Sequence, residues 1–450
     1  MKEILGNQVL ITGFGREGRS VLKYLRKNYP DVAVAVADKN PQSVADFNNQ
    51  VFSGDQYLDH IGGFSTVVRS PGVSKNTPQL QEAEHVTTAT NLFFSEAPGL
   101  IIGVTGTKGK STTSALIHHI LEYAGRDSRL VGNIGNPALD SLTDSSENTV
   151  FVLELSSYQL EDCRYSPHIA VVLPLRNEHL DYHSDFSSYV DAKRHIVTHQ
   201  KEEDIVVYNR QNVYSSEIAK SSNGVKVPYP GSSEIPLSSW ADNGFIWIND
   251  PEHKEQRLMR VGSVPLLGTA NIENVLAAVS VALSLQIDLH DIKEAIKSFK
   301  SLEHRLEEVG TVNNITFYND SLATIPEATI HALEALSERV ETLITGGFDR
   351  GIDYSLLGRA IAESNVLNTI LFPTTGEKIK KAILAINPAR DIKIFETDDM
   401  EQAVKIAGAI TSPGKICLLS PASASYNLFR DYAERGNAFK QAVMKIKDTA

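Results

Sequence analysis

Apolar and polar positions alternate along the chain with two periods, one typical of buried strands and the other of amphipathic helices. Short apolar runs predict strands at residues 9–12, 32–37 and 66–68. The stretch 19–28, between the first two runs, predicts a helix. A strand, a helix and a second strand in this order form a βαβ unit with parallel strands.

The same alternation continues to the end of the chain. Further strands are predicted at 100–104, 149–153, 169–173, 205–208, 316–318, 340–345, 369–372, 393–395 and 416–419, and helices at 111–124 and 274–285. Residues 220–265 are rich in Ser, Gly and Pro, so we expect loops and a small sheet there. Strands alternating with helices favour an α/β fold with mostly parallel sheets in three domains, residues 1–98, 99–300 and 301–450.

Composition narrows the class of protein. Of the 450 residues, 42% are hydrophobic, and 43 Lys and Arg stand against 55 Asp and Glu, a net charge of -12. This balance argues against a binder of nucleic acid or of membrane surfaces. Cys163 and Cys417 are too few for a disulfide framework and predict buried thiols. Without an apolar run of membrane-spanning length or a signal-peptide core, the chain is expected to be a cytoplasmic protein, and we expect a monomer.

A glycine-rich loop follows the strand predicted at 100–104. It runs through Gly106, Thr107, Lys108, Gly109, Lys110, Ser111, Thr112 and Thr113 into a helix. Glycines let backbone N–H groups converge on phosphate oxygens, and the helix N-terminus adds a positive dipole. Lys110 would neutralise the terminal phosphates and Ser111 would hold Mg²⁺. The strict phosphate-loop spacing needs glycine at Val104, so a glycine turn without nucleotide is the alternative.

A second glycine turn follows the first strand. Gly13, Gly15 and Gly18 have the spacing of a dinucleotide-binding fingerprint, and Asp38 lies twenty residues past Gly18. Taken alone, this pattern predicts an NAD enzyme. The diphosphate of another nucleotide would meet the same helix N-terminus, so the pattern does not separate the two ligands.

Candidate metal ligands lie after two central strands and on one helix. Glu154 comes directly after a strand, where a carboxylate can hold Mg²⁺, although a solvated turn carboxylate is commoner. His179 follows the next strand, at the edge where ligand sites of parallel sheets gather. Lys193 begins a helix, and an ordinary surface lysine is its simplest interpretation.

Together these segments resemble the Mur ligase family, and the likeness spans the whole chain. The G-T-x-G-K-S-T loop at 106–112 is the ATP motif of Mur ligases and folylpolyglutamate synthetases. Residues 153–160 look like the family's L-E-x-S-S-[FY]-Q-L segment, and 419–425 like its L-S-P-[AG]-x-A-S segment. Both are of the MurD type, the branch that adds glutamate. The resemblance implies a Rossmann-like UDP-sugar domain, a P-loop-like central domain for ATP and Mg²⁺, and a Rossmann-like glutamate domain.

The resemblance also implies a reaction. D-glutamate would be joined to UDP-N-acetylmuramoyl-L-alanine through an acyl phosphate, with ATP consumed, in peptidoglycan precursor synthesis. Besides the loop 106–113, the implied nucleotide contacts are Asn133, Asn271, Asn274, Arg305 and Asp320. The implied ligands of two Mg²⁺ ions are Ser111, Glu154, His179 and a carbamylated Lys193, and Lys110 completes the catalytic set.

Substrate contacts are implied in all three domains. With a UDP-sugar in place of NAD, the N-terminal contacts would be Gly15, Arg16, Glu17, Asp38, Lys39, Ser70, Pro71 and Gly72. In the central domain they would be Ser156, Ser157 and Gln159. In the C-terminal domain, Thr324, Arg350, Ser425, Tyr426 and Tyr432 would face the incoming glutamate.

Two departures from the family pattern leave alternatives open. Leu322 stands where a lysine is usual, and Lys108 where asparagine is usual. Both resemble a variant branch that attaches L-glutamate. A folylpolyglutamate synthetase-like ligase is a second alternative, although those relatives begin with the ATP domain. A nucleotide-binding regulator that has lost activity is the third, and Leu322 is its only support.

Overall fold

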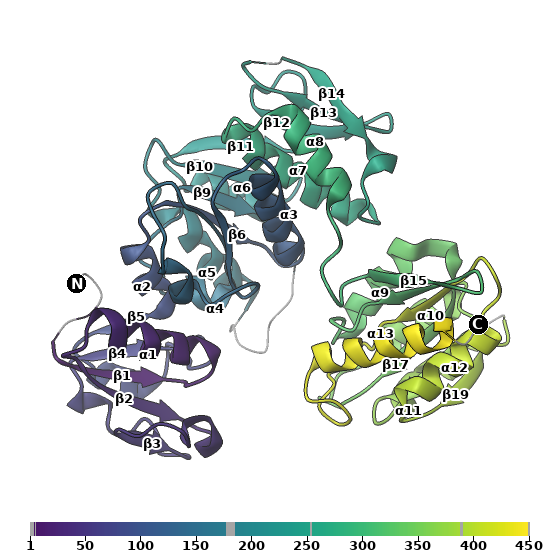
Figure 1. Ribbon diagram of the computed structural model, residues 1–450, viewed down its shortest axis with the longest axis horizontal. Helices are drawn as coiled ribbons and strands as arrows, with labels where there is room; N and C mark the ends of the chain where they lie inside the picture. Colours follow the sequence, from purple (N-terminus) through teal and green to yellow (C-terminus); the bar gives the residue numbers. More distant parts are fainter. Residues whose placement is uncertain (1–3, 5, 177–184, 253, 388–389, 449–450) are drawn as a thin grey trace. The chain divides into compact units, whose positions relative to one another are not determined.

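The computed structural model describes residues 4, 6–176, 185–252, 254–387 and 390–448 (Figure 1). The chain forms two compact units. The first comprises Met1–Val264 with Ala270–Phe299, and the second comprises Pro265–Thr269 with Lys300–Ala450. Three mostly parallel α/β sheets confirm the predicted fold class, and a fourth, small antiparallel sheet lies in the 220–265 region, as expected.

The N-terminal sheet is parallel throughout and has the strand order β3-β2-β1-β4-β5. Its strands are β1 (Gln8–Thr12), β2 (Ala33–Asp38), β3 (Val51–Ser53), β4 (Thr66–Arg69) and β5 (Val86–Thr88), with helices α1 (Arg16–Asn28) and α2 (Ala89–Glu96). Side chains alternate between the faces of a strand. Ile11 therefore packs with α1 and α2 on one face, while Leu10 packs with Leu58, Ile61 and Phe64 on the other.

The central sheet, in the same unit, is also parallel, in the order β11-β10-β9-β6-β8-β7. Its strands are β6 (Leu100–Thr105), β7 (Ser128–Gly132), β8 (Val150–Glu154), β9 (Ile169–Val172), β10 (Ile205–Asn209) and β11 (Val225–Tyr229). Its helices are α3 (Lys110–Tyr123), α4 (Ser157–Leu160), α5 (Phe186–Thr198), α6 (Val213–Lys220), α7 (Thr269–Ser284) and α8 (Leu289–Ser298). The small sheet consists of β12 (Ser238–Asp242), β13 (Phe245–Asn249) and β14 (Gln256–Arg260).

The second unit holds one six-stranded sheet, β15-β16-β20-β17-β18-β19, in which only β15 is antiparallel to its neighbour. The strands are β15 (Glu307–Val312), β16 (Ile315–Asn319), β17 (Val340–Gly346), β18 (Asn368–Phe372), β19 (Lys393–Glu396) and β20 (Ile416–Leu419). The helices are α9 (Pro326–Leu336), α10 (Ser355–Glu363), α11 (Gly376–Ala385), α12 (Met400–Ile410) and α13 (Tyr432–Asp448).

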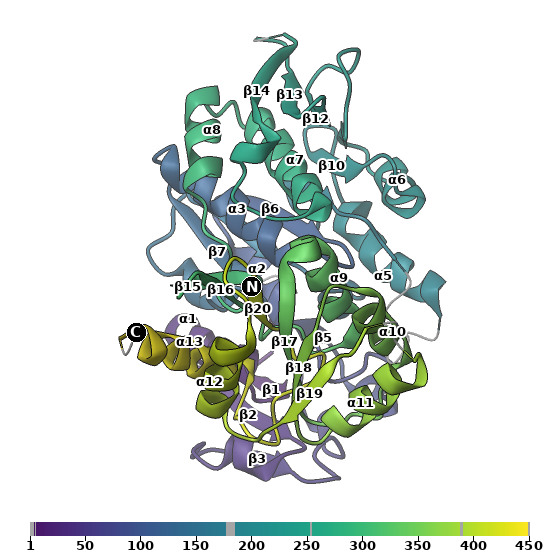
Figure 2. The same ribbon diagram turned by 90° about the vertical axis from the view of Figure 1, so that its right-hand side faces the viewer.

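Helices cover both faces of this last sheet, as Figure 2 shows. Leu343 packs with α9, α10 and α11, while its neighbour Ile344 packs with α12 and α13. Both cysteines are buried free thiols, as predicted. In the part of the chain that the structure describes, no helix has the length and apolar character needed to cross a membrane.

Candidate active site

The first glycine turn opens onto a hollow of about 530 Å³ at the carboxyl ends of β1, β2 and β4. Ligands of open parallel sheets bind at this edge. All eight predicted N-terminal substrate residues line it: Gly15, Arg16, Glu17, Asp38, Lys39, Ser70, Pro71 and Gly72. Gly132, Asn133 and Pro137 of the central domain complete the wall. Asn133, which the motif assigns to ATP, therefore lies in this hollow.

Backbone geometry explains the glycines of this turn. Gly13 has a φ of +81°, and a Cβ there would lie 2.1 Å from Ser70 Oγ. A Cβ on Gly18 would lie 2.3 Å from the Gly13 carbonyl oxygen. The Phe14 and Asn40 N–H groups donate to the two carboxylate oxygens of Asp38, at 2.6 and 2.8 Å. Asp38 thus holds the turn against the end of β2, and α1 begins at a glycine N-cap with no side-chain cap, a helix N-terminus of the kind that binds anions.

Glu17 is the unusual member of this hollow. Burial raises the pKa of its carboxyl, and a hydrogen bond from Gln159 opposes the shift. Gln159 Nε2 donates to Glu17 Oε1 at 2.9 Å, while Gln159 Oε1 accepts from the Ser156 N–H at 3.0 Å. Ser156 in turn caps α4, accepting from the Gln159 N–H at 3.3 Å. Two predicted central substrate residues are therefore tied to the N-terminal hollow.

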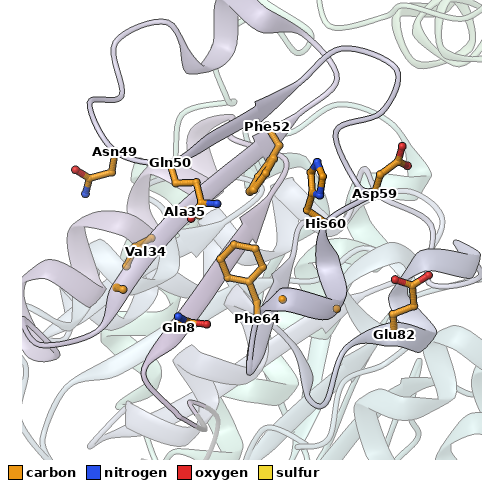
Figure 3. Close-up of a pocket in the computed structure, with 13 residues that line it drawn as sticks. Gln8, Val34, Ala35, Asn49, Gln50, Phe52, Asp59, His60, Phe64 and Glu82 are labelled. Carbon is orange, nitrogen blue, oxygen red and sulfur yellow. The ribbon is translucent and has the colours of Figure 1, made fainter.

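The larger hollow of the N-terminal sheet lies elsewhere. It measures about 780 Å³ and includes Gln8 and Ala33, the first residues of β1 and β2. Figure 3 shows the rings of Phe52, His60 and Phe64 gathered on one side of it. No residue of the predicted motifs lines it, and it contains the starts of strands rather than their carboxyl ends. We therefore place the site at the smaller hollow.

The second glycine loop connects β6 to α3. Gly106 and Gly109 have φ values of +155° and +85°. Lys110 is the first residue of α3, and its ammonium donates to the carbonyl oxygens of Gly106 and Thr107 at 3.0 and 2.9 Å. The positively charged ammonium of Lys110 therefore lies within the loop. Ser111, Thr112 and Thr113 follow in the first turn of α3, and the Thr113 N–H donates to the carbonyl oxygen of the N-cap residue Gly109 at 2.9 Å.

Neighbouring elements fix this loop. The Thr107 N–H donates to the Pro174 carbonyl at 3.1 Å, and Thr107 Oγ1 lies 3.1 Å from the Tyr189 hydroxyl. A Cβ on Gly109 would lie 2.2 Å from Asn274 Oδ1. Asn274 Nδ2 donates to Asn271 Oδ1 at 3.0 Å. The two asparagines that the sequence assigns to nucleotide thus lie beside the loop.

Comparison with known proteins fits this arrangement. The family model described as Mur ligase MurD-like, N-terminal domain matches residues 7–89, the Mur ligase middle domain matches 104–282, and the Mur ligase, glutamate ligase domain matches 304–423. A UDP-N-acetylmuramoylalanine--D-glutamate ligase of Acetivibrio thermocellus is 34% identical, covering 99% of this chain and 98% of that protein. A Koribacter versatilis protein of the same name is 33% identical, covering 99% of each.

The chain belongs to the Mur ligase family. It is therefore an ATP-dependent ligase that forms amide bonds. Among solved structures, MurF of Thermotoga maritima in complex with ADP has a TM-score of 0.58 at 17% identity, covering 100% of this chain and 97% of that one. A pseudomurein peptide ligase type C of Methanothermus fervidus has a TM-score of 0.59 at 15% identity, covering 98% and 100%. At this identity the two structures support the Mur ligase fold alone.

Two of the predicted metal-site residues lie buried in the Mur ligase middle domain. Glu154 is the last residue of β8 and is 5% exposed; within the described residues its Oε2 has no hydrogen-bond partner. Lys193 on α5 is 1% exposed, and its Nζ donates to Thr105 Oγ1 at 3.1 Å. Burial, reinforced by Lys110, holds the pKa of Lys193 well below its usual range, while Glu154 opposes the shift.

His179 lies outside the described residues, which omit 177–184. Among those that are described, no three His, Cys, Asp or Glu side chains form a cluster suited to a metal ion. A buried, unpaired carboxylate oxygen and a buried amine nevertheless fit a cation between them. A buried carboxylate is stabilised by a positive partner, whereas a charged ammonium at the same place would repel a cation.

The remaining predicted residues belong to the second unit. Arg350 donates to the Thr324 carbonyl at 2.7 Å, which joins two predicted glutamate contacts. Ser425 is buried, whereas Tyr426 and Tyr432 are exposed. Asp320 is buried, and its oxygens accept from Ser420 Oγ at 2.8 Å and from the Leu306 N–H at 3.1 Å. Burial raises the pKa of Asp320 to about 7. It therefore holds the segment of Arg305 against the end of β20.

The predicted site residues did not include two buried arginines. Arg435 is 2% exposed, and its guanidinium donates to Ser321 Oγ at 3.0 Å and to the Ser423 carbonyl at 3.0 Å. It joins the two loops that carry the predicted glutamate residues. Arg69 is 1% exposed at the end of β4. Each was visible as a charged residue next to a motif, but its partners lie far away in the sequence.

Proposed function

We propose that this chain joins D-glutamate to the alanine carboxylate of UDP-N-acetylmuramoyl-L-alanine and converts ATP to ADP and phosphate. The observation that carries the proposal is the full-length similarity to ligases named for this reaction, at 34% identity over 99% of the chain. The geometry supports it, because the first unit contains two separate anion-binding glycine turns. One suits the diphosphate of a UDP-sugar and the other the phosphates of ATP.

The first chemical step takes place at the second turn. An oxygen of the alanine carboxylate attacks the γ-phosphorus, the bond to the bridging oxygen breaks, and ADP leaves. Lys110 and the N–H groups of the loop offset the charge that develops on the transferred group. In the second step the glutamate amine attacks the acyl carbon, phosphate leaves, and the amine loses a proton as the amide forms.

Mg²⁺ ions would supply Lewis-acid charge stabilisation next to the phosphates. Ser111, Glu154, His179 and Lys193 are the residues proposed to hold two of them. Lys193 suits carbamylation because burial lowers its pKa and so favours the neutral amine, which is the form that can add CO₂. The resulting carbamate carries an anionic oxygen next to the unpaired Glu154 Oε2. An intact-mass measurement at neutral pH, with and without bicarbonate, tests the modification by the mass of one added CO₂.

The C-terminal domain is proposed to hold the incoming amino acid. Arg350 would pair with a glutamate carboxylate, and Ser425, Tyr426 and Tyr432 would surround it. Leu322, which follows Ser321 in the same segment, removes a cation that the family usually places there. The L-enantiomer is therefore the second candidate. We also propose that the protein is cytoplasmic and monomeric. Sedimentation of the purified protein tests whether it is a monomer.

The experiment is ADP release measured with ATP, Mg²⁺ and the UDP-sugar alanine substrate, plus either enantiomer of glutamate. The proposal predicts that release needs all components and is faster with D-glutamate. Faster release with L-glutamate would move the assignment to the L-branch. No release with either enantiomer, from protein that still binds ATP, would contradict a ligase function.

A further inference from the structure

Arg69 connects the two domains of the first unit beside the N-terminal hollow. It is the last residue of β4 and precedes the Ser70-Pro71-Gly72 turn. Its guanidinium donates to Asp162 Oδ2 from Nε at 3.1 Å and from Nη2 at 2.8 Å, and Nη2 lies 3.3 Å from Glu161 Oε1. Both carboxylates follow α4, in the central domain.

The same guanidinium also contacts its own domain. Nη1 donates to the carbonyl oxygen of Val73 and, at 3.4 Å, to that of Ser70. These carbonyls bracket the Ser-Pro-Gly turn that lines the hollow. One side chain therefore holds the turn from within and anchors it to the central domain. A planar guanidinium with five donors can do both at once, whereas a lysine ammonium cannot.

The electrostatics favour a fixed arrangement. Arg69 is 1% exposed and Glu161 is 5% exposed, so water does not screen the pair as it does at the surface. Lys75 Nζ lies 4.0 Å from the other oxygen of Glu161. Buried charges of this kind add little net stability but hold a geometry, because breaking one contact leaves a charge uncompensated.

The hollow needs such a fixed geometry, because its walls come from both domains. Gly13, Gly15 and the Ser-Pro-Gly turn form one wall, and Gly132, Asn133 and Pro137 form the other. Edge-to-face packing of Phe93 on α2 with Phe151 on β8, at 5.2 Å between ring centroids, joins the domains through the apolar core. This packing does not reach the turn, where Arg69 supplies the charged contact to the central domain and Lys75 Nζ adds a hydrogen bond to the Glu161 carbonyl at 3.4 Å.

We infer that Arg69, with Glu161 and Asp162, is a positioning residue that sets the distance between the two walls of the diphosphate hollow. The inference rests on the proposed UDP-sugar substrate. It extends that proposal by making affinity for this substrate depend on a buried ion cluster that does not contact it. Binding of ATP at the second glycine turn does not depend on the cluster.

The test compares Arg69→Met with a variant in which the whole cluster is neutral, Arg69→Met/Glu161→Gln/Asp162→Asn. The single change leaves the buried Glu161 and the partly exposed Asp162 without their arginine, so its melting temperature falls. The neutral variant removes those charges too, and its melting temperature recovers. Arg19→Met is the matched control, because Arg19 pairs with Asp46 at the surface, 2.7 Å away, and its Nη2 donates to the Ser43 carbonyl at 2.8 Å, away from α4 and from the Ser70-Pro71-Gly72 turn.

Affinity for the UDP-sugar alanine substrate is measured by calorimetry, which needs no turnover, alongside the KM values of both nucleotide substrates. We expect both Arg69 variants to lose on the order of tenfold or more in affinity for the UDP-sugar substrate, as misplaced walls lose contacts. The KM for ATP stays within about twofold, and Arg69→Lys recovers part of the loss because it restores one ion pair.

A neutral variant with the melting temperature and the UDP-sugar affinity of the wild type would overturn the inference. Equal losses for ATP and the UDP-sugar substrate would overturn it as well, since they indicate a general loss of structure. If the wild-type protein itself does not bind the UDP-sugar substrate, the proposed function fails instead, so the two failures are distinguishable.

Discussion

The two glycine turns of the first unit share a backbone design and differ in their side chains. Each follows a parallel strand, and each leads into a helix whose N-cap residue is a glycine, which has no side chain to cap the first N–H groups. In the N-terminal turn the neighbouring side chains include the carboxylates of Glu17 and Asp38. In the central turn the first helical residue is Lys110, whose ammonium lies within the loop. The backbone provides a general anion site, and the side chains decide what chemistry follows.

The difference matches the two proposed ligands. A UDP diphosphate is bound and released unchanged, so its site, which Arg16 and Lys39 line together with Glu17 and Asp38, needs complementarity but no group that acts on a transferred phosphate. The phosphates of ATP are the reacting group, and the site must offset charge that develops during transfer. A change at the N-terminal turn should therefore impair binding of the UDP-sugar substrate. A change at the central turn should impair ATP binding or turnover.

Lys110→Met should give the largest effect. Removing the ammonium from the loop is expected to lower kcat by about a thousandfold, since we propose that it contacts the group being transferred. Affinity for the UDP-sugar substrate should stay within about twofold by calorimetry, because the first turn is untouched. Steady-state ADP release measures kcat. A fall in UDP-sugar affinity without a fall in kcat would reverse the assignments of the two turns.

Paired glycine substitutions test the two turns separately. Gly109→Ala places a Cβ 2.2 Å from Asn274 Oδ1 at a φ of +85°, and Gly18→Ala places one 2.3 Å from a backbone oxygen. We expect Gly109→Ala to weaken ATP binding and Gly18→Ala to weaken UDP-sugar binding, each by about tenfold or more. Gly63→Ala is the control, since nothing lies within 4 Å of its Cβ. Equal effects of the two substitutions on both ligands would show that the turns are not independent.

The two turns should also differ in how the KM of their substrates depends on pH, because Glu17 lies at the N-terminal turn. Its raised pKa means that the carboxyl is neutral at lower pH and becomes charged as the pH rises through the shifted value. A charged carboxylate next to a diphosphate repels it, so the KM for the UDP-sugar substrate should rise with pH by a few-fold. Glu17→Gln should flatten this profile and leave the ATP profile unchanged. An unchanged slope in that variant would remove Glu17 from the account.

A carboxylate in the second unit provides a contrast with Asp38, which lines a hollow. Asp320 is buried by protein, and its pKa rises from an ordinary 3.8 to about 7. The folded state therefore favours the protonated form, so stability falls as the pH rises from about 4 towards 7. Asp320→Asn should reduce this fall by a few degrees in melting temperature. Melting curves at several pH values measure it, and parallel curves for the two proteins would contradict the prediction.

Much of the fold could be predicted from the sequence, because apolar runs such as Ile169–Val172 and Ile416–Leu419 are buried along their whole length. The short strands β3, β5 and β7 escaped prediction, since three to five residues with polar members carry little periodicity. The antiparallel strand β15 was not predicted either, because Glu307, Glu308 and Gly310 give it a polar sequence.

The candidate site, like the fold, contains residues that local sequence motifs predict and residues that they do not. The residues in the two glycine turns are close in sequence, so local motifs find them, and their roles stay predictions. Arg69 depends on Glu161 and Asp162, about ninety positions away, and no local pattern connects them. The hollow shared by Gly13 and Asn133 depends in the same way on how two sheets pack.

The most direct test of the central claim follows an oxygen atom. The UDP-sugar alanine substrate is prepared with a heavy oxygen isotope in the alanine carboxylate and incubated with ATP, Mg²⁺ and glutamate. If the carboxylate attacks the γ-phosphate at the Lys110 turn, the released inorganic phosphate carries one heavy oxygen, detected by mass spectrometry. Phosphate released without label, while the amide product forms, would contradict the acyl phosphate route and with it the role assigned to the second turn.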